Sequence, residues 1–189
     1  QPGAGEAHRA GLAHEQLKAE ALLQRALADA PDAVVVTKVG IDRRTEPPHR
    51  HFEADYVEEA VRRSVKRLGR APVVLLHHPS HPGGTSSGRE LKDAGAFTAM
   101  VAHAGAELIL HGHNHVRSVA FVPGPGGTSI PVVGAASASA RGDARHHRAS
   151  YHLYTITRRA TGYAVAGIER GLTESGTIAD LGALPLARS

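Results

Sequence analysis

Histidines follow two short apolar stretches of the chain, at spacings that suit metal binding. The run 108–110 leads into His111-Gly112-His113-Asn114-His115, and the run 73–76 leads into His77-His78. Neutral imidazole is a common ligand for zinc, iron and manganese. In an extended chain, side chains at positions i and i+2 point to the same face, so we expect His113 and His115 to address one cluster. His77, at the end of the other run, is the third predicted metal ligand.

Two neighbouring residues are candidates for a substrate pocket. His78 would point to the opposite face from His77 on an extended chain, which leaves open a pocket-lining role or a plain structural one. Asn114 lies between the two histidines of H-N-H and is the second pocket candidate. The glycine-rich segment 83–88 could cradle a phosphate group. It lacks the lysine and spacing of a P-loop, so we interpret it as a flexible loop.

Periodic apolar segments predict the elements that position these residues. Strands are expected at 34–36, 73–76 and 108–110, and helices over 14–30, 52–68 and 91–103. This alternation is typical of α/β layering. Short strands joined by glycine- and proline-rich turns then predict an antiparallel meander, at 116–122, 130–133, 151–157 and 163–168. We expect one domain over residues 1–189, with a loose terminus at 1–10 and a weakly ordered tail at 171–189.

The composition narrows the classes of function. The 189 residues include 22 basic and 18 acidic side chains, for a formal net charge of +4, and no cysteine. No basic stripe is interleaved with stacking aromatics, so we expect small anionic substrates and no nucleic acid. Any metal must be held by nitrogen and oxygen. No apolar run approaches the ~20 residues needed to cross a bilayer, so we expect a cytoplasmic protein without a membrane partner.

The order of these segments resembles a known family over much of the chain. From about Pro72 to Thr157 the sequence is similar to the C-terminal half of calcineurin-like metallophosphoesterases, in which an H-H-P strand end is followed by a helix, a strand and G-H-x-H. The resemblance implies a calcineurin-like α/β/β/α layered sandwich, incomplete at its N-terminal side. It also implies one or two divalent metal ions (manganese, iron or zinc) that hydrolyse phosphate esters. By position, His77 and His113 would serve one metal and His115 the other.

The N-terminal part of the chain departs from the family pattern. The family's other ligand motifs are D-x-H, G-D and G-N-H-[ED], and they are not found at their places here. The segment 31–37 resembles the strand that carries G-D, yet it continues as Lys38-Val39. An aliphatic side chain then replaces the bridging carboxylate, and no residue can be assigned as the general acid. We therefore expect at most one tightly bound metal and slow hydrolysis.

Two hypotheses of function follow. The first is a truncated or divergent metallophosphoesterase, a phosphodiesterase or phosphomonoesterase that acts on a small phosphate ester. The alternative is a non-catalytic module that keeps the sheet and binds a metal or a partner chain. Substrate identity depends on the loops around such a site, and the sequence leaves both the substrate and the oligomeric state open.

Overall fold

A computed structural model describes residues 22–29, 41–42, 47, 49–50, 53–69, 73–142 and 147–187. The chain divides into two compact units, Gln1–Arg70 and Ala71–Ser189. Each unit is described by itself. The strand predicted at 34–36 lies outside the described residues, and of the helix predicted over 14–30 the described part is helical at 22–26.

The first unit contains a short strand pair and one long helix. Strands β1 (Ile41–Asp42) and β2 (His49–Arg50) pair antiparallel, and helix α2 spans Ala54–Leu68. Valine at 57, 61 and 65 and leucine at 68 form one apolar stripe of α2. The helix ends at Gly69, whose left-handed backbone (φ 62°) lets its N–H bond to the Val65 carbonyl oxygen. The helix predicted over 52–68 is confirmed within two residues.

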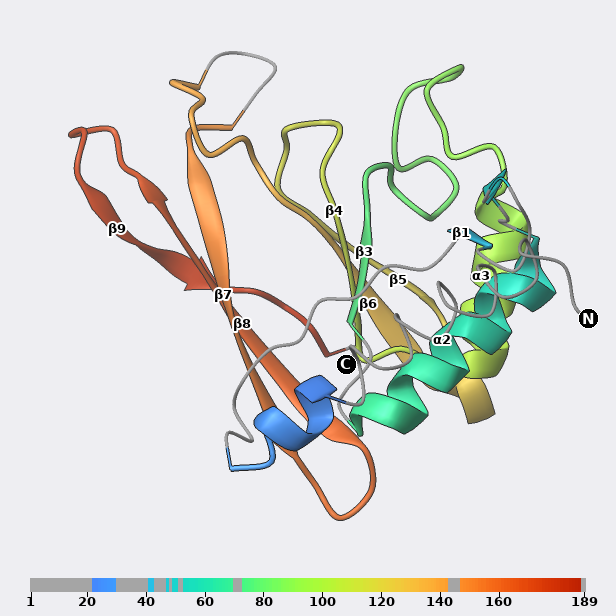
Figure 1. Ribbon diagram of the computed structural model, residues 1–189. Helices are drawn as coiled ribbons and strands as arrows, with labels where there is room; N and C mark the ends of the chain where they lie inside the picture. The colour runs from blue at the N-terminus through green and yellow to red at the C-terminus, as the bar shows by residue number, and fades with distance from the viewer. Residues whose placement is uncertain are drawn as a thin grey trace, which may run out of the picture. The chain divides into compact units, whose positions relative to one another are not determined.

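The second unit begins with a strand–helix–strand segment that builds a four-stranded mixed sheet (Figure 1). Its elements are β3 (Val73–Leu76), α3 (Ala94–Ala104), β4 (Leu108–His111), β5 (Ser118–Pro123) and β6 (Ser129–Gly134). The strand order is β3-β4-β6-β5, with β3, β4 and β6 parallel and β5 antiparallel to β6. Helix α3 begins three residues later than predicted, because Leu91–Asp93 form a turn in which the Ala94 N–H bonds to the Leu91 carbonyl oxygen.

A separate antiparallel sheet completes this unit. It consists of β7 (Ser150–Arg158), β8 (Tyr163–Leu172) and β9 (Ile178–Ala183), in that order. The single meander predicted after residue 116 is therefore wrong, because β6 pairs with the buried parallel strand β4 and belongs to the first sheet. The segment expected as a tail from residue 171 holds the end of β8 and all of β9. The sequence gives little sign of β9, because glycine and aspartate interrupt a short run of small and aliphatic residues that is mostly exposed.

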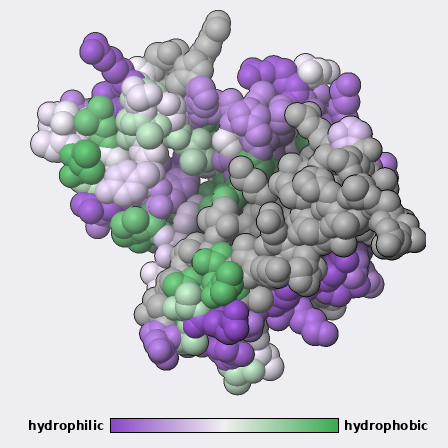
Figure 2. Space-filling view, viewed as in Figure 1, coloured by the Kyte–Doolittle hydropathy of each residue, from purple (hydrophilic) through white to green (hydrophobic). Residues whose placement is uncertain are grey.

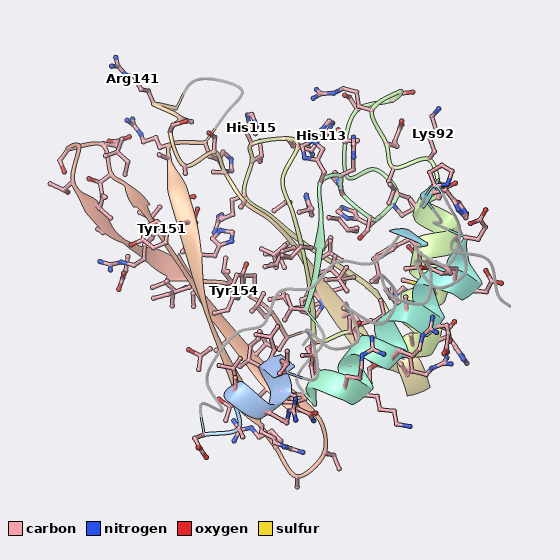
Figure 3. The ribbon with its side chains drawn as sticks, in the orientation of Figure 1. Lys92, His113, His115, Arg141, Tyr151 and Tyr154 are labelled. Atoms are coloured by element: carbon pink, nitrogen blue, oxygen red, sulfur yellow. The ribbon has the colours of Figure 1, made fainter. Side chains whose placement is uncertain are left out.

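An apolar cluster joins the two sheets. Leu108, Val133 and Leu184 are buried in it, and Tyr154 and Val165 pack against it. Alternation along the strands places Ile109 and Val132, both 0% exposed, on the other face of the mixed sheet. Burial raises the pKa of the Tyr154 hydroxyl. Figure 3 shows Tyr154 on the side of β7 toward the mixed sheet.

The far face of the antiparallel sheet carries apolar side chains in the open. Tyr151, Leu153, Ile168 and Ile178 are exposed there, and Figure 2 shows apolar residues scattered among polar ones over this sheet. Among the described residues, no helix is both long enough and apolar enough to span a bilayer. The described residues have mixed α/β content, with a four-stranded mixed sheet, a three-stranded antiparallel sheet and the antiparallel pair β1–β2.

Candidate metal centre

The site lies where two parallel strands end side by side. In the register of β3 and β4, Leu76 pairs with His111, so both carboxyl ends open at the same edge of the sheet. His77 and His78 follow β3 at once, and His113 follows β4 after one glycine. The Gly112 N–H donates to the His77 carbonyl oxygen at 3.2 Å. This bond ties the two strand ends together just below the imidazoles.

Three imidazoles meet at this edge. The ligand nitrogens of His77, His78 and His113 all lie within 4.8 Å of one another, so the group could hold a metal ion. Nδ1 of His113 and Nε2 of His77 lie 3.2 Å apart, within hydrogen-bond distance of each other. The ring centroids of His78 and His113 are 4.3 Å apart. Figure 3 places His113 in the loops at this end of the strands.

Two histidines that follow β4 have an unusual left-handed backbone conformation. His113 and His115 have φ angles of 69° and 55°, and they are the only non-glycine residues with positive φ in the described part of the chain. A left-handed backbone is disfavoured for residues with a Cβ and is found mostly where the surroundings enforce it. The Asn114 N–H donates to the Gly112 carbonyl oxygen at 2.9 Å, which closes a three-residue turn centred on His113.

A side-chain clamp holds this turn against the loop after β3. The Asn114 amide donates to the Gly84 carbonyl oxygen at 2.5 Å, and its Oδ1 accepts from the Thr85 hydroxyl at 2.7 Å. Both ends of the amide are thereby used to join the 113–115 turn to the glycine-rich loop. This clamp, together with the bond from the Gly112 N–H to the His77 carbonyl oxygen, stabilises the left-handed backbone of His113.

The donor set fits a divalent transition metal. Two nitrogens that bind one tetrahedral zinc with bonds of ~2.0–2.1 Å lie roughly 3.3 Å apart, close to the 3.2 Å between the His113 and His77 nitrogens. Nε2 of His113 is buried without a hydrogen-bond partner among the described residues. One imidazole gives only one nitrogen to an ion, so this second nitrogen would stay without a partner when Nδ1 binds. Nitrogen ligands favour zinc, iron or manganese over magnesium or calcium.

The electrostatics keep the central imidazole neutral. Desolvation lowers the pKa of His113, and repulsion of a protonated ring by its neighbours His78 and Arg89 lowers it further. A neutral ring offers the lone pair that a metal needs. Within the part of the chain that the structure describes, the group consists of histidines alone and contains no carboxylate. A dication held there would keep its full charge.

The structure groups the predicted residues differently from the sequence pattern. It brings His77 and His113 together, joins His78 to them, and leaves the exposed His115 outside the group. The rule of alternating faces does not apply at His78, because β3 ends at Leu76 and the chain bends there. It fails again between His113 and His115, because both have left-handed backbones. Asn114 is in the clamp and also lines a pocket.

A further histidine pair lies beneath the site. His111, at the end of β4, is 5% exposed, and its ring centroid lies 6.1 Å from that of His81. Burial lowers the pKa of both rings. Nδ1 of His81 and Nε2 of His111 are buried without hydrogen-bond partners among the described residues. Neither was assigned as a ligand from the sequence, and the one signal for them was the strand-end position of His111.

Comparison with known proteins places the chain in no family. No family model matches the sequence, and no curated protein matches it. The chemistry of the site therefore has to be argued from its own residues. Three imidazoles at a strand edge can bind one metal ion and leave positions open for water or a ligand.

Proposed function

We propose that this chain is a metal-dependent hydrolase of phosphate esters, in which His77, His78 and His113 hold one divalent ion. The observation that carries the proposal is the convergence of these three imidazoles, from two parallel strand ends, within 4.8 Å. The resemblance to calcineurin-like metallophosphoesterases supplies the reaction class and the layered sandwich, both of which are part of the proposal. Zinc, iron and manganese all suit the nitrogen ligands.

The ion, when bound, would polarise a phosphoryl oxygen and lower the pKa of a water molecule. The chain's own residues would hold the metal ligands in place and orient the substrate. The Asn114 clamp fixes the backbone of His113 against the loop after β3. Arg89, which adjoins this loop and lines the pocket beside it, brings a permanent positive charge. Charge that is fixed in place before the reaction often contributes more to catalysis than any other single effect.

A second function is favoured by one specific observation. Among the described residues the histidine group has no carboxylate, and a pair of metal ions normally needs a bridging oxygen ligand between them. A chain with one ion and no general acid would bind a metal or a partner chain without fast turnover. This non-catalytic module is the alternative proposal.

Hydrolysis of p-nitrophenyl phosphate and bis-p-nitrophenyl phosphate, with added zinc or manganese, separates the two functions. We expect slow, metal-dependent turnover that His113→Ala abolishes. The matched control is His103→Ala, because His103 is exposed on α3 and lies outside the group. Turnover that survives His113→Ala would contradict the proposal. Tight metal binding without any turnover would select the non-catalytic module.

A further inference from the structure

A pocket of about 530 Å³, with both polar and apolar walls, opens beside the metal centre. It is lined by the loop after β3 and by the chain between β4 and β5, with these residues: His81, Gly83, Gly84, Thr85, Ser86, Arg89, Asn114, Val116 and Ser118. None of the three metal-site histidines is among them. Figure 2 shows hydrophilic residues over the loops at this end of the strands. The pocket and the metal centre are therefore neighbours that meet at Asn114.

The charge of the pocket has one sign. Arg89 is its permanent cation, and no acidic side chain is among the described residues that line it. Burial lowers the pKa of His81, so this ring adds no charge at neutral pH. A guanidinium presents several N–H donors in a plane and pairs well with phosphate oxygens. An anion in this pocket would meet the positive charge of Arg89 and no negatively charged side chain among the described lining residues.

The pocket also has hydroxyl groups that can donate hydrogen bonds to an anion. Ser86 and Ser118 line the pocket, whereas the Thr85 hydroxyl is already used in the clamp with Asn114. A guanidinium together with hydroxyl donors can serve the several oxygens of a tetrahedral anion. The loop lies close against the pocket wall because Gly84 has no side chain. A Cβ there would lie 2.5 Å from Cβ of Pro79 and 2.9 Å from the His81 ring.

We propose that this pocket binds a second phosphate group of the substrate, separate from the phosphate at the metal centre. Two positive centres stand side by side, one formed by Arg89 and one by the metal ion that the histidines would hold. A ligand that carries two phosphate groups, such as a diphosphate, satisfies both centres at once. The volume exceeds what one phosphate fills and leaves room for the adjoining part of such a molecule. The identity of the ligand as a substrate rests on the proposed function, whereas phosphate binding by the pocket does not.

Titration of the metal-free chain with inorganic phosphate in the presence of a chelator tests the pocket alone. We expect saturable binding that Arg89→Ala weakens at least tenfold and Arg89→Lys weakens less. The control Arg159→Ala removes an exposed arginine after β7, outside the pocket, and should bind phosphate like the wild type. Absence of saturable binding to the wild type, or equal binding by Arg89→Ala, would overturn the proposal.

Pyrophosphate and the zinc-loaded chain test whether the two centres act together. We expect zinc-loaded wild type to bind pyrophosphate at least tenfold more tightly than inorganic phosphate, and Arg89→Ala to lose that preference while it keeps zinc. Equal affinity of the zinc-loaded wild type for the two anions would overturn the two-phosphate assignment. Because these are binding measurements, failure of hydrolysis would count against the proposed function and not against the pocket.

Discussion

Nδ1 of His113 and Nε2 of His77 lie 3.2 Å apart, although 36 positions separate the two residues along the chain. A loop, helix α3 and strand β4 connect them, and the parallel pairing of β3 with β4 brings their strand ends together. Two neutral imidazoles can form a hydrogen bond at this distance, with one ring as the donor and the other as the acceptor. Two ligands of one tetrahedral zinc ion stand at about the same separation, so the pair also suits the metal site that we propose.

Replacing Asn114 should weaken metal binding without removing a ligand. Asn114→Ala deletes both bonds that join the 113–115 turn to the loop after β3. The strained backbone of His113 is then held less firmly, and loss of such outer partners typically costs about 10–100-fold in metal affinity. A competition titration with a zinc indicator measures this loss. Thr85→Ser keeps the hydroxyl and should match the wild type, and wild-type affinity in Asn114→Ala would refute the clamp.

An alanine at position 134 should destabilise the second unit. A Cβ on Gly134 would lie 2.5 Å from the Ser118 hydroxyl and 2.7 Å from the His111 ring. Overpacking of this kind costs about 1–3 kcal/mol of unfolding free energy, measured by urea denaturation. Gly95→Ala is the matched control, because a Cβ on this residue of α3 meets open space. We expect the control to be as stable as the wild type or slightly more stable, and equal effects of both changes would count against the packing.

The stability of the antiparallel sheet should depend on pH through His152. Burial lowers the pKa of His152 below 6.5; the carboxylate of Glu169 raises it in part and the charge of Arg117 lowers it. Below pH 6.5 the unfolded chain therefore binds more protons than the folded chain, and stability falls as the pH drops toward the folded pKa. His152→Asn keeps a group in reach of the Tyr154 hydroxyl, 3.0 Å from Nδ1 in the wild type, and does not titrate. Urea denaturation at pH 7.5 and 5.5 should show a smaller loss in this variant, and an unchanged loss would exclude His152 as the cause.

The strands and helices that carry the site could be predicted from the sequence, because their signals are local. The apolar run 73–76 is confirmed as β3, and the run 108–110 as the start of β4. The parallel pairing of β6 with β4 could not be predicted from the sequence. Strand β5 lies between them in the chain and pairs with β6, so β4 and β6 are neighbours in the sheet but not along the sequence. Pairing of distant segments depends on the packed sheet and not on the residues near each strand.

The residue types of the site were also predictable, but their grouping was not. Histidines at both strand ends predict a metal site, and that coarse expectation agrees with the group that the structure shows. Which histidines converge depends on the bend after Leu76 and the left-handed backbones at His113 and His115. Such conformations are uncommon for any residue with a Cβ, and the prediction from the i, i+2 spacing assumes an extended backbone at these positions. The assignment of His115 to a second metal stays a prediction.

Calorimetric titration of the metal-free chain with zinc tests the three-histidine centre most directly. We predict one tight site per chain, weakened at least a hundredfold in His78→Ala and in His113→Ala and almost unchanged in His115→Ala. The comparison of His78 with His115 is decisive, because the structure places His78 in the group and His115 outside it. A site that survives His78→Ala and is lost in His115→Ala would contradict the three-histidine centre, as would two tight zinc sites per chain.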